Sequence, residues 1–312
     1  MSRPSSSLVS DEEACLALNG HCEKGVAAAA RPSDSNGVSP DHFVRRLAAV
    51  NIRLVLGLHA FYELARTLQS SRSGTPTRGT ALFRYLGQYL ETNMLCAKDQ
   101  SELLPAEMLM LKKGPERVEF FYPREDHLKI VAECQRLANG EQSELARQFL
   151  SEQLEFAART RKGIVGFLDA RPELKKRLSN IAPQALETWL RRESVSIRGH
   201  SNLARHIAFR FPEVAEDEVT EYAIGLFDLP MKRYARGLVR ADLYLHWRYA
   251  QFDALPKDLV DDVYHVLNSS YCDMYATADP KQKYARLLLT SNTKTAIWPR
   301  HIRVDNWMES LS

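Results

Sequence analysis

The sequence predicts an α/β protein in which a parallel sheet is flanked by helices and interrupted by a large, all-helical insertion. Short apolar runs alternate with stretches of helical apolar period near both ends of the chain, whereas residues 126–251 carry the helical period alone. Strands separated by helices imply a parallel sheet with right-handed crossovers. We therefore predict an N-terminal α/β half at 11–125, a helical insertion or cap at 126–251, and a C-terminal half at 252–312 that completes the same domain.

The N-terminal half begins with two predicted strands, each followed by a helix. Residues 14–18 form a short apolar run that ends in a turn, and residues 52–58 are rich in aliphatic and β-branched side chains. Turn-forming residues precede a helix that starts near Pro40. The helical spacing of apolar residues predicts further helices at 60–69 and 81–91.

The C-terminal half repeats the alternation. A helix is predicted at 257–268, a short buried strand at 272–279, a helix at 281–290 and a last strand at 295–299. We predict that this half forms one discontinuous domain with the N-terminal half.

Composition excludes several classes of protein. The 312 residues include 45% hydrophobic side chains, and 42 basic against 39 acidic residues give a net charge of +3, so any surface for a polyanion must be local. No stretch approaches the roughly 18 uncharged apolar residues of a membrane helix, and no basic and apolar leader is present. Five scattered cysteines without a CxxC pair suit a reducing compartment. We expect a soluble, cytoplasmic protein without a membrane partner.

Carboxylates gather near the ends of the predicted strands, where the chemistry of a parallel sheet is located. Glu63 follows the second strand, Asp261 and Asp262 lie on the helix before the strand at 272–279, and Asp273 and Asp279 flank that strand. Several carboxylates at one edge would repel each other unless a hard divalent cation neutralised them. The pattern predicts a Mg²⁺ or Mn²⁺ site.

Three short motifs resemble those of PIN-domain nucleases, and they occur in the family's order. The segment from Asp262 to Asp279 is similar to the C-terminal signature, LVLGLHAFYELARTL to the second motif with its glutamate, and ACLALNG to the opening L-D-x-N motif. The residues that carry the resemblance are Asn19, Glu63, Asp262, His265, Cys272, Asp273, Thr277 and Asp279. The helical middle of the chain has no counterpart in these motifs.

The resemblance implies a PIN-like Rossmannoid sheet and a metal-dependent nuclease, with RNA favoured over DNA as the substrate. Glu63, Asp262 and Asp279 would be the catalytic, metal-holding carboxylates, and Asp273 a further metal ligand. Asn19 and Thr277 would orient those carboxylates through hydrogen bonds. The resemblance also suggests a toxin or defence effector, with an inhibitory or antitoxin protein as a second kind of partner, and it leaves a homodimer open.

The first motif departs from the family at its aspartate. Ala17 stands at that position, so the carboxylate that helps hold the metal is replaced by a methyl group. Two explanations stay open: an aspartate replaced to silence a toxic nuclease, or a natural, catalytically dead PIN-like fold that binds nucleic acid or a protein. An α/β scaffold with unrelated surface acids is a third alternative.

A nuclease needs a cationic surface for the phosphate backbone, and the helical insertion supplies candidates. We predict contacts from Arg161, Lys162, Arg191 and Arg192. A further group that includes Arg236 and Arg240 lies near tyrosine and tryptophan residues that could stack on bases. The alternative is that these basic side chains belong to the solvated faces of amphipathic helices.

Overall fold

The computed structural model describes somewhat more than two thirds of the chain, including every strand of the sheet and the helices from residue 100 onward. The described residues are 14–18, 45, 49, 52–57, 61, 65, 68, 79–80, 83–84, 86–87, 90–91, 94–114, 119–228, 233–277, 284–289 and 293–297.

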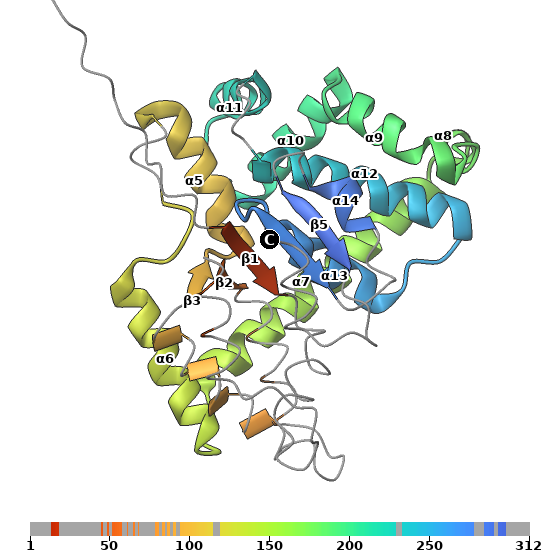
Figure 1. Cartoon of the computed structure of the whole chain (residues 1–312). Coiled ribbons are helices and arrows are strands. Elements are labelled where there is room, and N and C mark those ends of the chain that lie inside the picture. The colour runs from red at the N-terminus through yellow and green to blue at the C-terminus, as the bar shows by residue number, and fades with distance from the viewer. Residues whose placement is uncertain are drawn as a thin grey trace, which may run out of the picture.

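Five parallel strands form a single sheet in the order β3-β2-β1-β4-β5 (Figure 1). Their bounds are β1 Ala14–Leu18, β2 Ile52–Gly57, β3 Met94–Ala97, β4 Met274–Thr277 and β5 Lys294–Ile297. β1 is central and pairs with β2 on one side and with β4 on the other. The parallel sheet and the four predicted strands are confirmed, and the two ends of the chain share one sheet as expected. β3 was not predicted.

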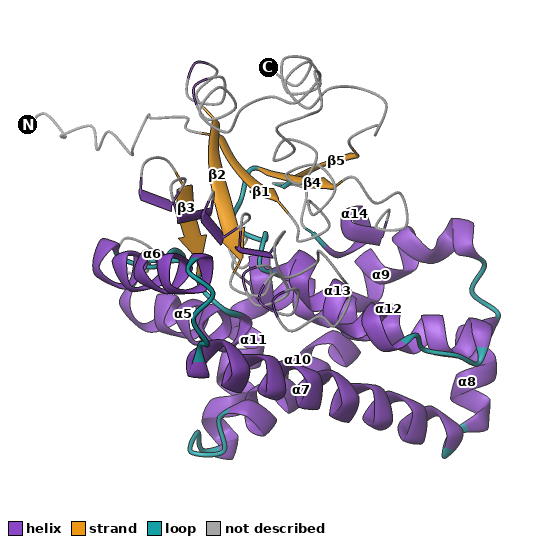
Figure 2. Ribbon diagram, turned by 90° about the horizontal axis from the view of Figure 1, so that it is seen from below, coloured by secondary structure: helices purple, strands orange, loops and turns teal. Residues whose placement is uncertain are grey.

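Most of the other described residues are helical, and Figure 2 shows these helices gathered mainly on one side of the strands. From residue 100 onward they are α5 Gln100–Lys113, α6 Arg124–Ala138, α7 Glu144–Asp169, α8 Pro172–Ser179, the 3-10 turn η3 Pro183–Ala185, α9 Leu186–Ser194, α10 Ile197–Arg210, α11 Glu216–Asp228, α12 Arg233–Phe252, α13 Lys257–Leu267 and α14 Ala285–Leu288. The helical character predicted for 126–251 is confirmed. None of the helices in the described ranges is long and apolar enough to cross a membrane.

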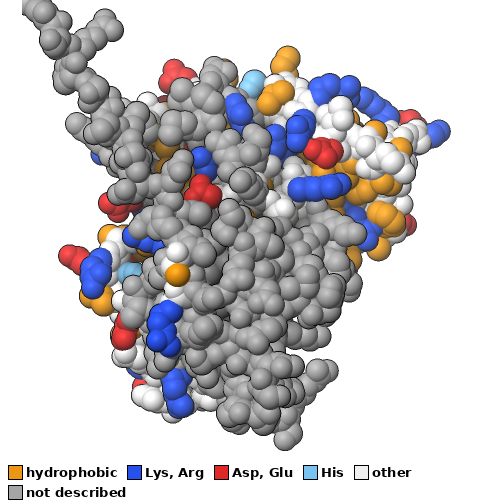
Figure 3. Space-filling model, viewed as in Figure 1, with side chains coloured by type: hydrophobic (Ala, Val, Ile, Leu, Met, Phe, Trp, Pro, Cys, Tyr) orange, Lys and Arg blue, Asp and Glu red, His pale blue; other side chains and the backbone are white. Residues whose placement is uncertain are grey.

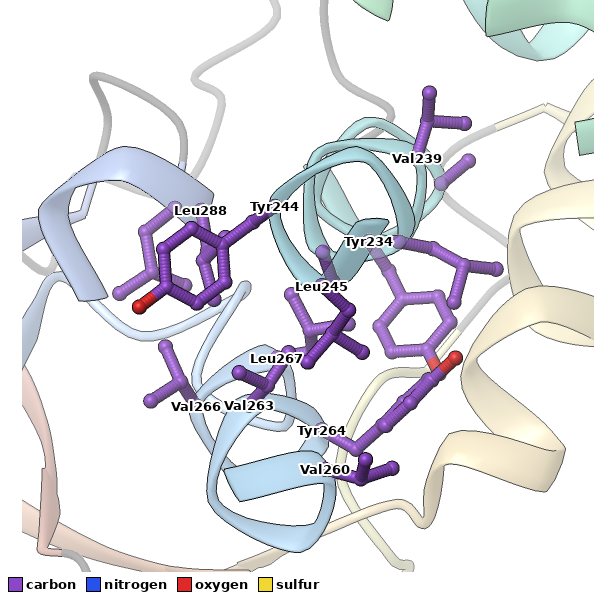
Figure 4. Packing of buried hydrophobic residues seen from close by; sticks show 14 of the residues in the cluster. Tyr234, Val239, Tyr244, Leu245, Val260, Val263, Tyr264, Val266, Leu267 and Leu288 are labelled. Atoms are coloured by element: carbon purple, nitrogen blue, oxygen red, sulfur yellow. The ribbon is translucent and has the colours of Figure 1, made fainter. Parts of the chain in front are cut away.

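α12 lies at the centre of the helical part. It packs against α5, α7, α8, α9, α10, α11, α13 and α14, so that apolar side chains are needed around most of its circumference. Figure 4 shows how its Tyr234 and Leu245 face Val263 and Tyr264 of α13. The same hydrophobic cluster includes Tyr275 and other side chains of the sheet. The helical part and the sheet therefore share one core.

The first turn of α12 is held by a buried carboxylate from another helix. Glu107 of α5 is fully buried, and its carboxylate accepts hydrogen bonds from the backbone N–H groups of Tyr234 (2.7 Å) and Ala235 (2.8 Å). It also accepts one from the hydroxyl of Tyr271, which lies shortly before β4. A negative charge at a helix N-terminus satisfies N–H groups that have no partner within the helix. Glu107 thus joins α5, α12 and the approach to β4.

The carboxyl ends of β2 and β3 point toward the layer of helices that contains α5 and α13 (Figure 2). Gly57 ends β2 and lies directly beside Asn268, because a Cβ atom at Gly57 would sit 3.6 Å from the Asn268 side chain. α5 begins three residues after β3 ends. Helices therefore cover this part of the sheet's carboxyl edge.

Candidate active site

The strand order identifies one place at the carboxyl edge where a ligand is expected. The chain adds β2 and β3 on one side of β1 and then β4 and β5 on the other, so the direction of addition reverses between β1 and β4. Open parallel sheets bind ligands outside the carboxyl ends of the strands at such a switch point. We call this place the β1–β4 edge.

Two of the predicted site positions lie on the strands that form this edge. Ala17 pairs with Val55 of β2 and Tyr275 of β4, one residue before β1 ends. Thr277 is the last residue of β4. Since Leu18 pairs with Ala276, the two strands end at the same level. Position 17, where the resemblance would have an aspartate, therefore lies on the strand next to the switch point.

Three other predicted residues, Asn19, Glu63 and Asp279, lie outside the described residues. In the sequence, Asn19 directly follows β1, and Asp279 comes two residues after the end of β4. Their assigned roles stay predictions.

Asp262 lies on α13, the helix that leads into β4. It is half-buried, as is its neighbour Asp261, while His265 one turn further is buried. α13 is held by α7, α12 and α14, so Asp262 stands on a rigid element. A site on a packed helix keeps a carboxylate in a defined position.

Asp273 has a different position from the other acids. It is exposed and directly precedes Met274, the first residue of β4, so it lies at the amino end of the strand. A rise of about 3.3 Å per residue separates it from Thr277 by roughly 13 Å. The proposed metal site is at the carboxyl edge of the sheet, whereas Asp273 is at the amino edge. Asp273 is therefore not part of the proposed site.

No group of three or more Asp, Glu, His or Cys side chains with metal-ligand spacing occurs among the residues that the structure describes. Glu63 and Asp279 are not among these residues.

A second set of acids, which the sequence reasoning missed, follows β3. Asp99 is 8% exposed, and its backbone carbonyl accepts the N–H groups of Glu102 and Leu103, both at 2.9 Å, at the start of α5. The carboxylate of Glu102 accepts a hydrogen bond from the hydroxyl of Tyr122. Burial and this carboxylate raise the pKa of Tyr122 above its ordinary value. These groups are occupied by contacts that hold β3, α5 and the segment at 119–122 together.

The comparisons with known proteins give no relative. No family model matches the chain, and neither does any curated protein or solved structure. The fold and the β1–β4 edge therefore carry the functional argument by themselves.

The predicted nucleic-acid contacts lie on two helices that both pack against α12. Arg161 and Lys162 are on α7, whereas Arg191 and Arg192 are exposed on α9. Figure 3 shows Lys and Arg side chains over the region of α8 and α9. On α9, Arg191 forms an ion pair with Glu187 (2.8 Å) and Arg192 one with its neighbour Glu193 (3.3 Å). Exposed pairs of this kind are weak, so these arginines can exchange their carboxylate for a phosphate.

Proposed function

We propose that this protein has a PIN-like fold and that its β1–β4 edge is the site of a metal-dependent nuclease, with RNA as the favoured substrate. The observation that supports the proposal most is the coincidence of two independent patterns. One pattern is the strand order, which reverses between β1 and β4. The other is the motif resemblance, whose positions 17–19 and 277–279 fall at or just after the carboxyl ends of these two strands.

The donor set suits a hard cation. Glu63, Asp262 and Asp279 offer carboxylate oxygens, which Mg²⁺ and Mn²⁺ prefer over nitrogen and sulfur ligands. When bound, such a cation supplies Lewis acidity for the attack of water on a phosphodiester. Ala17 removes one oxygen donor from the central strand, so the site as it stands has a weaker hold on the cation.

Within this site, the residues of the chain have separate tasks. The three carboxylates fix the position of positive charge, while Asn19 and Thr277 would donate hydrogen bonds that keep the carboxylates oriented. Asp262 adds the rigidity of α13. The net positive charge of the chain does not oppose a polyanionic substrate.

The second candidate function is a catalytically dead PIN-like module that binds nucleic acid or a protein. Ala17 favours it directly, because a metal site that has lost a carboxylate from its central strand is expected to lose activity. The two candidates share the fold and differ only in whether aspartate at position 17 restores chemistry.

The test is Mn²⁺-dependent cleavage of labelled single-stranded RNA and DNA. The proteins compared are the chain as it stands, Ala17→Asp, and the double variant Ala17→Asp/Asp279→Asn. We expect Ala17→Asp to cleave RNA at least about 100-fold faster than the other two, which is a typical effect of losing one key group in a catalytic site. Binding without cleavage by all three proteins would support the dead module, and neither binding nor cleavage would overturn both candidates.

A further inference from the structure

α10 and α11 lie side by side in the outer layer of the helical part. Both helices pack on α12 and on each other, while α9 flanks α10 and α5 flanks α11. Figure 1 shows the two helices next to each other near the top of the view. Because both rest on the same helix, the faces that they turn away from α12 are on the same side of the molecule. We call these two exposed faces together the α10–α11 surface.

The exposed face of α10 carries positive charge only. The sequence of this helix contains no Asp or Glu. At about 100° per residue, its exposed side chains fall within an arc of about 120°. They are Ile197, Arg198, Ser201, Arg205, Ala208 and Phe209. Arg198 lies 3.7 Å from the carboxylate of Glu193, which is long for an ion pair, and Arg205 donates a hydrogen bond to the side chain of Asn202.

The exposed face of α11 has the opposite charge. The sequence of this helix contains no Lys or Arg. Glu218 pairs with Lys112 of α5 at 3.6 Å. Three further acids of the helix are exposed and form no ion pair among the described residues, namely Glu216, Asp217 and Glu221. An acidic face therefore borders the basic face of α10.

Large apolar side chains are exposed on both faces. Ile197 is 83% exposed and Phe209 72% exposed on α10, and Ile224 is 48% exposed on α11, one turn beyond Glu221. At a rise of about 1.5 Å per residue, Ile197 and Phe209 lie roughly 18 Å apart, one near each end of α10. Exposed apolar groups that are bordered by charges mark surfaces that bind other macromolecules.

The two opposite charges decide which kind of partner fits this surface. The axes of packed helices are about 8–10 Å apart, which is close to the Debye length at physiological salt. An anionic lipid surface or a nucleic acid that approaches α10 would therefore also meet the repulsion of α11. A second copy of this chain offers an acidic face to the basic helix and a basic face to the acidic helix.

We propose that the α10–α11 surface is the interface of a symmetric homodimer, in which α10 of each chain packs on α11 of the other. A two-fold axis makes this contact occur twice, so the arginines of each chain face the acids of its partner. Ile197, Phe209 and Ile224 become buried between the two chains. The inference goes beyond the proposed function and depends on neither a metal ion nor a substrate.

The size of the surface sets the expected strength of the dimer. Both helices are about 20 Å long and about 10 Å wide, so they give a footprint of roughly 400 Å² per chain. A total of roughly 800 Å² is at the lower end for specific interfaces. We therefore expect a dissociation constant in the micromolar range.

The test is the dissociation constant of the unmodified chain, measured by sedimentation equilibrium over about 1–100 µM protein. We expect a dimer that weakens as the KCl concentration rises, because opposite charges contribute to the contact. A chain that stays monomeric up to about 100 µM would overturn the proposal. Flotation of such a monomer with phosphatidylserine vesicles would assign the surface to a membrane in place of a second copy.

Two charge-reversed variants test the pairing of the helices. Arg198→Glu/Arg205→Glu makes both faces of the surface acidic, and Asp217→Lys/Glu221→Lys makes both basic. We expect each variant alone to dimerise at least about tenfold more weakly than the unmodified chain, because like charges then face each other. An equimolar mixture of the two variants should associate again, a result that damage to the fold cannot produce. A mixture that stays monomeric would overturn the proposal.

Lys129→Glu/Arg147→Glu is the matched control. It reverses the same number of charges on exposed side chains of α6 and α7 that pair with Asp126 and Glu144. We expect the control to dimerise within about twofold of the unmodified chain, because these side chains lie outside the α10–α11 surface and distant exposed charges are screened. Equal losses in the control and in Arg198→Glu/Arg205→Glu would contradict the assigned surface.

Ile197→Ser tests the surface without a change of charge. Because this side chain is largely exposed in the single chain, the melting temperature measured at about 1 µM should change by no more than about 2 °C. The dimer should become about tenfold weaker, since each dimer buries two copies of the side chain. Unchanged dimerisation by Ile197→Ser would overturn the proposal. All of these measurements are made without metal or nucleic acid, so their outcome is independent of the proposed nuclease.

Discussion

The two ends of the sheet's carboxyl edge use acidic side chains in opposite ways. Beside β3, Glu102 and Glu107 accept hydrogen bonds from buried or partly buried donors, and Glu107 has no exposed surface at all. At the β1–β4 edge, Asp279 comes two residues after β4 in the sequence, at the kind of place where open parallel sheets bind ligands. A carboxylate near a strand end is therefore a weak indication of chemistry until its hydrogen-bond partners are known.

The largest effect on stability is expected beside β3, where helices cover the carboxyl edge of the sheet. Glu107→Ala removes the acceptor for two buried backbone N–H groups of α12 and for the partly buried hydroxyl of Tyr271. We expect the free energy of unfolding to fall by about 3–4 kcal/mol, measured by urea denaturation. Glu141→Ala, an exposed position after α6, is the control and should change it by less than about 0.5 kcal/mol. A loss for Glu107→Ala as small as the control's would break the comparison.

The helical side also holds a half-buried histidine, His206, which makes the stability of the protein depend on pH. Burial lowers the pKa of His206 to about 4, with Arg210, Arg205 and His246 acting in the same direction and Asp242 against them. As the pH falls, the unfolded chain takes up the proton near pH 6.5, but the folded chain does not until about pH 4. Stability is therefore full above pH 6.5 and is lost as the pH falls toward 4, by up to about 3 kcal/mol.

Urea denaturation at several pH values measures this loss. His206→Gln removes the titrating group, so the difference in unfolding free energy between the chain and the variant should shrink as the pH falls from 7 to about 4. A difference that stays constant over this range would show that His206 titrates normally in the folded protein.

A smaller effect on stability is expected at Gly237, where α12 lies close to α13 and α14. A Cβ atom at Gly237 would lie 2.9 Å from Cδ2 of Leu267 in α13 and 3.5 Å from the carbonyl oxygen of Leu288 in α14. Gly237→Ala should reduce the unfolding free energy by about 1–2 kcal/mol. Gly163→Ala on α7 has open space and should raise it by up to about 1 kcal/mol. Thermal melts of both variants measure the contrast, and equal signs would contradict the packing described here.

The smallest expected effect is on Mn²⁺ affinity, and it tests which acidic residues belong to the proposed site. Asp273 lies at the amino end of β4, so Asp273→Asn in the Ala17→Asp background should leave Mn²⁺ affinity unchanged. Asp262→Asn in the same background should weaken it by about tenfold, as loss of a ligand or of its support does. Titration calorimetry distinguishes the two, and a loss for Asp273→Asn would return this residue to the site.

Most of the fold could be predicted from the sequence because its elements have strong periods. β1, β2, β4, β5 and the helical part at 126–251 follow from apolar runs and helical spacing. β3 has the sequence MLCA, without a β-branched or aromatic residue, so its composition does not favour a strand. α5 has Pro105 in its interior and buries Leu103, Leu104 and Met108, so it shows no single apolar stripe and contains an apparent breaker.

The candidate site was less predictable than the fold. The role of an acidic side chain depends on which end of a strand it occupies and on hydrogen-bond partners that are far away in the sequence. The motif groups Asp273 with Asp279, although the strand predicted between them already places Asp273 at its amino end. Glu107 finds its partners at residues 234, 235 and 271, far along the chain.

The most direct measurement of the central claim is Mn²⁺ binding, because it depends on the β1–β4 edge and not on the choice of substrate. Titration calorimetry compares the chain as it stands, Ala17→Asp, and Ala17→Asp/Asp279→Asn. We predict that aspartate at position 17 tightens Mn²⁺ binding by about tenfold or more and that the second change removes this gain. Equal Mn²⁺ affinities for all three proteins would contradict a metal site at the point where the sheet changes direction.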